Sequence, residues 1–348
     1  MRLLSQALGK YVHFPHKFFE MPANMIELDH IKLPILAELE RYVALFDEVL
    51  THDEDFMNQV LSYVRSRKGK MMRPILVLLL AKELGTIEEP TLRSAVTLEL
   101  LHTSSLIHDD VVDESEERRG KASVRHVYDN KIAVLLGDYM LAQTLEQSAL
   151  TKSVRVVEAV ARLGATLAEG EILQLTAVHK ETISESAYYS IITRKTASLF
   201  EACGALAALS MQASEEVLQQ YRRLGEIIGL CFQIRDDIFD YYNDSTIGKP
   251  SGKDMAEGKL TLPVIAALKL SNSAEANEIA LRVKQGESTQ EEREWLIDFA
   301  KSQGGISYAE AKMEELSNEA RHIVAGFSNE MVKTSLLSYI DLVVGRNY

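Results

Sequence analysis

Residues that break helices are scarce in this sequence. It contains 18 glycines and 7 prolines among 348 residues, about 7% of the chain, where about 12% is usual. β-Sandwiches and α/β proteins need many tight turns, and tight turns depend on these two residues. The shortage therefore favours long helices joined by short connections, in one large domain or two of ordinary size.

Cysteine and long apolar runs are scarce as well. Cys203 and Cys231 are too few to crosslink a chain of this size, so we expect a reducing compartment, the cytoplasm. The apolar run ILVLLLA at 75–81 is much shorter than the roughly 20 residues of a membrane span. It predicts a buried helix, and no transmembrane segment is expected.

The sequence also lacks an excess of positive charge. It has 38 Lys and Arg against 51 Asp and Glu, for a net charge of −13. Nucleic-acid binding depends on a basic face, and adhesion to an anionic membrane depends on the same sign of charge, so both are disfavoured. An acidic protein can still hold an acidic substrate when metal ions lie between them.

Apolar residues recur at spacings of three and four along most of the chain, as on amphipathic helices. Strand-like alternation is not sustained. We expect one all-α domain over 25–348 with about a dozen helices, preceded by a flexible extension at 1–24, and a loop at 243–259. The predicted helical segments are 33–51, 54–65, 74–84, 89–113, 130–149, 153–178, 185–210, 214–242, 261–270, 274–284, 290–302, 307–325 and 329–344.

Aspartates cluster twice with the pattern D-D-x-x-D, in SLIHDDVVD at 105–113 and in QIRDDIFD at 233–240. On a helix the first and last aspartates of this pattern share a face, and the middle one supports them from the side. Carboxylates this close in apolar surroundings repel one another, and Mg²⁺, which prefers oxygen ligands, removes the repulsion. We therefore expect several Mg²⁺ ions on a bound diphosphate. The predicted ligands are Asp109, Asp113, Asp236 and Asp240, supported by Asp110 and Asp237.

Two other interpretations fit the acidic residues less well. A single acidic cluster is usually a solvated helix face, but two clusters of equal spacing inside apolar helices are not explained in that way. Di-iron helical bundles use Glu-x-x-His pairs, and such an enzyme would leave the aspartates without a role. The chain has three such pairs, at Glu27/His30, Glu99/His102 and Glu319/His322.

Cationic residues occur close to both clusters although the chain is acidic. Lys70 and Arg73 stand where an apolar helix begins, and a helix N-terminus is a natural anion site. Lys195 interrupts an apolar helix, where an ammonium without a partner is costly. Each alone would be ordinary surface charge, but together they predict a diphosphate site. Arg118, Arg119 and Lys121 follow the first cluster, and Lys249, Lys253 and Lys259 follow the second.

With these motifs the sequence resembles the trans-isoprenyl diphosphate synthases, or polyprenyl synthetases. The matching run covers roughly 69–263 and includes GKMMRP, ELLHTSSLIHDDVVDESEERRGK, LLGD, RKT, FQIRDDIFD and GKPSGKDMAEGKLTLP. The resemblance implies an all-α homodimer with the isoprenoid synthase fold around a central apolar cavity, and about three Mg²⁺ ions per active site. It also implies head-to-tail condensation of an allylic diphosphate with isopentenyl diphosphate. Lys68 and Met71 stand where the family often has Gly and Arg.

The resemblance implies roles for individual residues. Metal binding would fall to Asp109, Asp113 and Asp236, and through water to Asp240. The allylic diphosphate would be held by Arg118, Lys195, Lys249 and Lys259. The isopentenyl diphosphate would be held by Lys70, Arg73, His102 and Arg119. The developing allylic cation would be stabilised by the oxygens of Thr196 and Gln233.

Product length is expected to depend on the helical turn before Asp109. In the family the growing chain passes along the first aspartate helix, and short-chain members resemble this site but carry aromatic residues there. Ser104 and Ser105 leave the path open. They predict a long-chain, octaprenyl-type product, primed by farnesyl or geranylgeranyl diphosphate, for a quinone side chain. If the serines only fill packing space, the floor lies elsewhere, for instance on 136–147, and a shorter farnesyl or geranylgeranyl product is the alternative.

Two further functions are alternatives. A terpene cyclase of the same fold would leave Lys70, Arg73 and His102 without a role, and its second metal motif normally contains Asn, Ser and Glu. A noncatalytic subunit of a heteromeric synthase would be expected to lose motif residues, and this sequence retains them.

Overall fold

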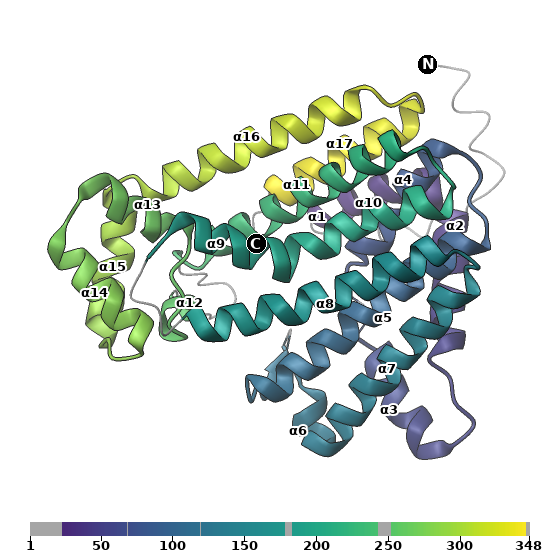
Figure 1. Ribbon diagram of the computed structural model, residues 1–348, viewed down its shortest axis with the longest axis horizontal. Coiled ribbons are helices and arrows are strands. Elements are labelled where there is room, and N and C mark those ends of the chain that lie inside the picture. The colour runs from purple at the N-terminus through teal and green to yellow at the C-terminus, as the bar shows by residue number, and fades with distance from the viewer. Residues whose placement is uncertain (1–22, 68, 119, 178–182, 243–251, 346–348) are drawn as a thin grey trace.

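The structure, a computed structural model, describes residues 23–67, 69–118, 120–177, 183–242 and 252–345 of the chain. These residues form a body of packed helices, with α16 (Gly305–Ala325) along one edge. The helices α13 (Leu262–Ser271), α14 (Ala274–Gln285) and α15 (Gln290–Ser302) make up one end of the molecule (Figure 1).

The remaining elements follow in chain order. The helices of the first half are α1 (Ala23–Lys32), the 3₁₀ turn η2 (Leu33–Ile35), α2 (Leu36–Val49), α3 (Asp55–Arg65), α4 (Met72–Leu84), α5 (Glu89–Val112), α6 (Val124–Tyr128), α7 (Asn130–Leu150) and α8 (Val154–Ala177). Those of the second half are α9 (Glu185–Ile192), the π-helical segment η3 (Thr193–Ala197), α10 (Ser198–Ser210), α11 (Glu215–Phe239), α12 (Lys253–Ala256) and α17 (Glu330–Val344). The strands are β1 (Glu117–Arg118) and β2 (Lys121–Ala122).

The predicted all-α class is confirmed. Most helices begin and end within a few residues of the predicted ranges, because the apolar residues that set the helical period are the ones that become buried. The apolar run at 75–81 is a case in point, since its side chains in α4 are fully buried. Among the described residues, no helix combines the length and the apolar character needed to cross a membrane.

Two local features differ from the prediction. The segment expected as one helix over 185–210 is interrupted by η3, where the hydrogen-bond pattern widens to that of a π-helix. The connection between α5 and α6 contains a two-stranded antiparallel hairpin, β1–β2. Periodicity could not indicate either feature, because η3 keeps a helical pattern and each strand has only two residues.

Two of the longest helices, α5 and α11, carry the aspartate clusters in their last turns. Helix α10 lies against α11 and joins it to α5. Glycines allow the α10–α11 contact to be close: a Cβ atom at Gly204 would lie 2.0 Å from Tyr221 O, and one at Gly225 would lie 2.1 Å from Phe200 O. The close contact fixes where the end of α11 lies relative to η3.

Several predictions fall at or beyond the limits of the described chain. Helix α1 begins at Ala23, so the predicted boundary between 24 and 25 lies inside a helix. Of the extension predicted for 1–24, residues 1–22 lie outside the described residues. Arg119 and Lys249 are outside the described residues, and their proposed roles stay predictions.

Candidate diphosphate and metal site

The first aspartate cluster occupies the C-terminal turn of α5. Asp109 is half-buried, and Asp113, the C-cap residue directly after the helix, is exposed. The C-terminal end of a helix carries partial negative charge, so carboxylates are unfavourable there unless cations accompany them. The second cluster has the same placement, with Asp240 as the C-cap residue directly after α11.

The environment of Asp109 is unfavourable for a charged carboxylate. Burial, followed by the nearby carboxylate of Glu171 on α8, raises the pKa of Asp109 to about 6. Lys195 and Arg118 act in the opposite direction. This position therefore accumulates negative charge that the protein compensates only in part, as expected of a carboxylate that binds a cation.

Lys195 lies in η3, directly beside the carboxylate of Glu171. Its Nζ is 2.5 Å from Glu171 Oε2 and 2.9 Å from Gln174 Oε1. A Cβ atom at Gly170 would lie 2.9 Å from Arg194 Cβ, so glycine allows α8 and η3 to approach. Single π-turns occur often at functional sites. The sequence indicated that Lys195 needs a partner, but not that the partner is Glu171.

Arg118 on β1 is held by the middle aspartate of the first cluster. Its Nε donates to Asp110 Oδ1 at 2.6 Å, and Asp110 is buried. The supporting role predicted for Asp110 thus corresponds to a charge-assisted hydrogen bond that orients a cation.

A chain of hydrogen bonds links η3 to the second cluster. Thr196 Oγ1 donates to Gln233 Oε1 at 2.7 Å, and Gln233 Nε2 donates to Asp237 Oδ1 at 2.7 Å. Tyr188 OH donates to Asp237 Oδ2 at 2.6 Å. Asp237 is buried, and burial raises its pKa well above the usual range. Tyr188 was not singled out in the sequence, where a tyrosine in an apolar helix looks like a core residue.

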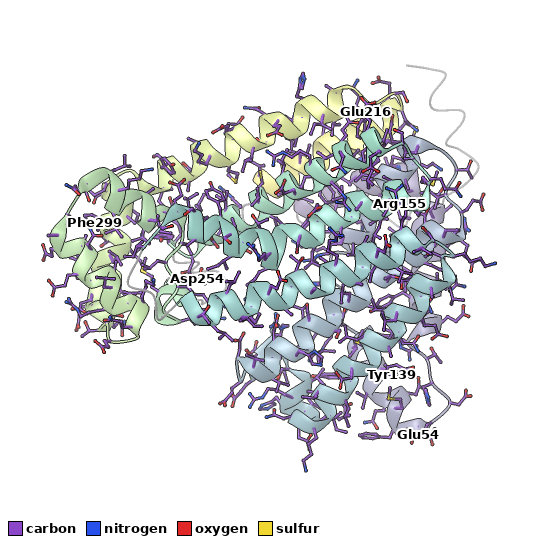
Figure 2. The ribbon with its side chains drawn as sticks, in the orientation of Figure 1. Glu54, Tyr139, Arg155, Glu216, Asp254 and Phe299 are labelled. Carbon is purple, nitrogen blue, oxygen red and sulfur yellow. The ribbon has the colours of Figure 1, made fainter. Side chains whose placement is uncertain are left out.

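Asp240 connects the second cluster to α12. Its side chain accepts hydrogen bonds from the backbone N–H of Lys253, at 2.9 Å, and of Asp254, at 3.1 Å. Asp254, which lies between the α13–α15 end and the main bundle (Figure 2), has its pKa raised to about 6 by burial and then by Asp240. Asp254 is thus a further carboxylate at this site that the sequence motif did not single out.

Lys259 follows the second cluster in sequence and interacts with carboxylates near both clusters. Its Nζ lies 2.5 Å from Glu257 Oε2. Burial alone would lower the pKa of Lys259, but the carboxylates of Glu257, Asp254 and Asp113 outweigh burial and raise it. A residue that follows the second cluster in sequence therefore interacts electrostatically with the first cluster.

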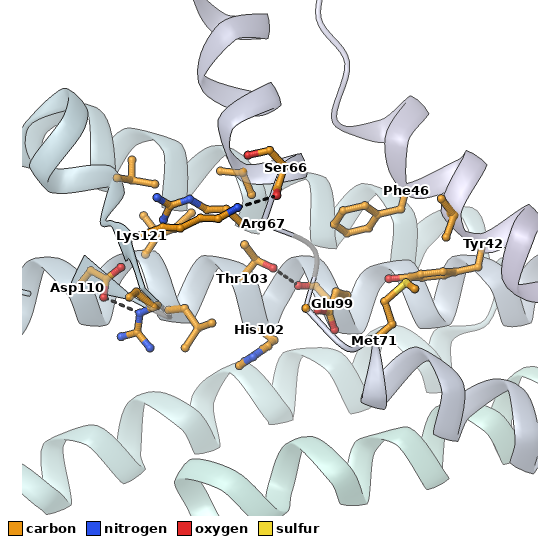
Figure 3. A pocket seen from close by; sticks show the side chains of 17 residues that line it. Tyr42, Phe46, Ser66, Arg67, Met71, Glu99, His102, Thr103, Asp110 and Lys121 are labelled. Carbon is orange, nitrogen blue, oxygen red and sulfur yellow. Dashed lines mark hydrogen bonds and ion pairs between the residues drawn. The ribbon is translucent and has the colours of Figure 1, made fainter. Parts of the chain in front are cut away.

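A cavity of about 240 Å³ lies on the other side of α5, towards α2 and α3 (Figure 3). One end is apolar and includes Val43 and Phe46, whereas the other end carries charged and polar groups. The charged and polar lining residues include Arg67, Glu99, His102, Asp110, Arg118 and Lys121. His102, predicted to hold isopentenyl diphosphate, is thus buried in the wall of a cavity with a cationic end.

The two cations predicted with His102 lie at the start of α4. Lys70 precedes the helix and is exposed, and Arg73 is its second residue. The Arg73 guanidinium lies 5.2 Å from the centre of the Phe200 ring. Arg73 is therefore anchored on its apolar side near a helix N-terminus, where anions are favoured.

Ser104 and Ser105 differ in their surroundings. Ser104 is fully buried, and its Oγ donates to Gly137 O on α7 at 2.9 Å. Ser105 is half-buried, and its Oγ donates to His102 O within α5. Ser104 is therefore engaged with α7, and Ser105 is the better candidate for contact with a growing chain.

The donor set fits magnesium bound together with a substrate. Within the described ranges, no three His, Cys, Asp or Glu side chains converge closely enough to hold a metal ion alone. Mg²⁺ usually takes one or two carboxylates and completes its octahedron with water and phosphate oxygens. Asp109, with its raised pKa, and Asp236, on the second cluster, supply oxygen donors of this kind.

Known proteins match both the sequence and the fold. The chain matches the polyprenyl synthetase family over residues 54–299. It is 34% identical over 303 residues to octaprenyl diphosphate synthase of Haemophilus influenzae, covering 86% of this chain and 91% of that protein. A solved geranylgeranyl pyrophosphate synthase from Bacteroides thetaiotaomicron is 44% identical with a TM-score of 0.81, covering 92% of this chain and 100% of that one. A solved decaprenyl diphosphate synthase from Rhodobacter capsulatus is 33% identical with a TM-score of 0.84, covering 91% and 98%.

Proposed function

Because the chain belongs to the polyprenyl synthetase family of prenyltransferases, we propose that it condenses an allylic diphosphate with isopentenyl diphosphate, head to tail. The product is a long-chain all-trans polyprenyl diphosphate for a quinone side chain. The observation that carries the proposal is the placement of two aspartate clusters at the ends of α5 and α11, with Lys195 acting on Asp109 of the first cluster and Lys259 interacting electrostatically with Asp113.

We assign metal binding to the outer aspartates of both clusters: Asp109, Asp113, Asp236 and Asp240. Bound Mg²⁺ supplies positive charge that stabilises diphosphate as a leaving group. Asp240 already accepts two backbone N–H groups, which suits a contact with the metal through water rather than a direct one. Asp109 carries the raised pKa that a neighbouring cation would relieve.

The cationic side chains complete the binding of the two substrates. We assign the allylic diphosphate to Lys195, Arg118 and Lys259, with Lys249 by resemblance. We assign the isopentenyl diphosphate to Lys70, Arg73 and His102, with Arg119 by resemblance. Fixed positive charge placed where negative charge develops lowers the barrier to departure of the diphosphate.

Thr196 and Gln233 are assigned to the allylic cation. Thr196 donates its hydroxyl proton to Gln233 Oε1, and the amide of Gln233 is oriented by Asp237 and Tyr188. The lone pairs of Thr196 Oγ1 thus stay available to a developing positive charge. Their orientation is set before the substrate arrives, so little reorganisation is needed during the reaction.

The reaction is tested by incubating the protein with radiolabelled isopentenyl diphosphate, farnesyl diphosphate and Mg²⁺, and measuring label in the solvent-extractable product. We expect incorporation that depends on both substrates and is lost with EDTA. Label that remains in isopentenyl diphosphate under all conditions would contradict the proposal.

Product length has a second candidate, because the solved structure with 44% identity is named as a geranylgeranyl pyrophosphate synthase. The curated relatives with 34% identity are named as octaprenyl diphosphate synthases. Chromatography of the hydrolysed products separates the two candidates. A ladder that ends at 20 carbons would favour the shorter product.

Replacing Ser105 with Phe is expected to shorten the product by one or more isoprene units. An aromatic ring one turn before Asp109 would block a chain passing along α5. Ser104→Phe is not a suitable control, because Ser104 is fully buried against α7. The measurement is the product ladder of Ser105→Phe and of Ser105→Ala. The same ladder for both variants and for the wild type would rule out this role for Ser105.

We propose a homodimer formed through α7 and α8. Both helices expose large apolar side chains, with Leu135 63% exposed, Leu145 58% and Ile172 61%. An exposed apolar surface of this kind on two neighbouring helices usually marks an interface. In a homodimer the same surface of each copy meets the other.

Replacing Leu135 and Leu145 together with Glu is expected to weaken the dimer at least about 100-fold, because charged groups would be buried in the interface. Light scattering after size-exclusion chromatography measures the mass. Leu270→Glu, at an exposed leucine on α13, is the control and should remain dimeric. A wild type that elutes as a monomer at micromolar concentration would exclude the dimer.

We assign the protein to the cytoplasm and the catalytic domain to residues 25–348. Cys203 and Cys231 are unpaired and buried, as suits a reducing compartment. Burial raises the pKa of both thiols, so neither is set up as a nucleophile.

A further inference from the structure

The β1–β2 hairpin that carries Arg118 is too small to be stable alone. Each strand has two residues, and isolated hairpins of greater length are already marginal in water. Arg118 lies directly opposite Lys121 in the pairing, and like charges in that position are destabilising. Contacts from outside the hairpin must therefore hold it in place.

Helix α3 and the residues that follow it supply these contacts. Tyr63 OH donates to Ala122 O, the carbonyl of the last residue of β2, at 2.8 Å. The Arg67 guanidinium donates to the same carbonyl and to Tyr63 OH, and it lies 4.0 Å from the centre of the Tyr63 ring. Lys121 Nζ donates to Ser66 O at 3.4 Å.

Both opposed cations of the hairpin line the same cavity (Figure 3). Arg118 is compensated by Asp110, whereas Lys121 is exposed and donates to a neutral carbonyl. Two cations kept facing each other at a cavity wall create a positive potential there, which an anion would relieve. The repulsion between the two cations destabilises the folded hairpin, and the contacts from α3 and the residues after it offset this destabilisation.

We propose that Tyr63 and Arg67 are positioning residues, which hold the hairpin so that Arg118 and Lys121 together present two cations to a substrate diphosphate. The inference rests on the proposed function, because it concerns the binding of the same substrates. It adds Lys121 to the cations at the site, and it makes α3 part of the machinery that orients them.

Tryptic cleavage tests whether Tyr63 and Arg67 hold the hairpin in place, and this test does not depend on enzyme activity. The sequence of the hairpin, 117–122, contains Arg118, Arg119 and Lys121, after which trypsin cleaves once the backbone can open. Tyr63→Phe removes one hydroxyl and is expected to increase the rate of cleavage at these three residues about fivefold, as mass spectrometry of the fragments would show. Tyr128→Phe is the matched control, because the Tyr128 ring packs against Tyr63 at 5.7 Å between centroids. Its hydroxyl makes no hydrogen bond to a described hairpin residue.

Steady-state kinetics tests the consequence for binding. Tyr63→Phe is expected to raise KM for the diphosphate substrates about threefold to fivefold with kcat nearly unchanged, and Lys121→Gln should raise KM similarly. Tyr128→Phe should leave both constants unchanged. Unchanged KM values in Tyr63→Phe and Lys121→Gln would overturn the inference. An inactive wild type would instead contradict the proposed function. The rate of tryptic cleavage would still decide whether Tyr63 and Arg67 hold the hairpin in place.

Discussion

Replacing Asp109 with asparagine is expected to lower kcat at least about 100-fold, because it removes the negative charge that is proposed to hold Mg²⁺ at the leaving diphosphate. Asparagine keeps the shape of the side chain. Asp109 half-buried beside Glu171 carries a pKa raised to about 6, so the ionised carboxylate is unfavourable in the folded protein. Loss of activity should therefore come without loss of stability.

The effect of this substitution on stability has a defined sign. The folded-state pKa of Asp109 is raised above its ordinary value of 3.8, so the folded protein binds the proton more tightly than the unfolded chain does. The ionised group consequently reduces stability above pH 6, and this cost fades as the pH falls from 6 towards 4. Asp109→Asn should thus melt at the same or a higher temperature than the wild type at pH 7.5 in EDTA, with a smaller difference at pH 4.5.

The control for Asp109→Asn is Asp298→Asn, at an exposed carboxylate on α15. It should leave kcat and the melting temperature unchanged. Retention of more than a tenth of the wild-type kcat by Asp109→Asn would contradict the role of the first cluster. A clear fall in melting temperature would show that Asp109 serves the fold instead.

Replacing Gly225 with alanine is expected to destabilise the protein by about 3 kcal/mol, the upper end of the usual cost of overpacking. The new Cβ would lie 2.1 Å from Phe200 O, a backbone atom that cannot move aside without shifting α10. Since α10 continues from η3, the same shift would disturb the hydrogen bond between Thr196 and Gln233. Activity should therefore fall together with stability.

Gly164→Ala is the matched control, since it makes the same change inside helix α8. The new Cβ would lie 3.9 Å from Leu101 Cδ1, an ordinary contact. Alanine is favoured over glycine in a helix interior by about 1 kcal/mol, so this variant should melt at a slightly higher temperature. Urea denaturation of both variants measures the difference. Equal stability of Gly225→Ala and the wild type would show that the two helices can separate freely.

The sequence predicts the helices and both clusters because these depend on local spacing. Asp109 and Asp113 are four residues apart, and a helical period alone places them on one face. The sequence also indicates the cations, because motif order places Lys259 after one cluster and Arg118 after the other. The structure adds the electrostatic interaction of Lys259 with Asp113, across two segments that are remote in sequence.

The partners of these residues could not be predicted, because they come from contacts between distant segments. Glu171 on α8 pairs with Lys195 only because η3 shifts the helical register and Gly170 allows the approach. Tyr188 meets Asp237 across 49 residues of sequence. Ser104 and Ser105 are neighbours in the same turn of α5, but only Ser104 donates to a carbonyl on α7. The spacing of residues within α5 cannot predict this difference, because it depends on where α7 packs.

Mass spectrometry of the products tests the central claim most directly. The protein would be incubated with farnesyl diphosphate, isopentenyl diphosphate and Mg²⁺, in parallel with Asp109→Asn. The account predicts polyprenyl diphosphates lengthened in steps of one isoprene unit beyond 20 carbons with the wild type, and almost none with the variant. Farnesyl diphosphate recovered without elongation by a folded wild type, or equal elongation by Asp109→Asn, would contradict it.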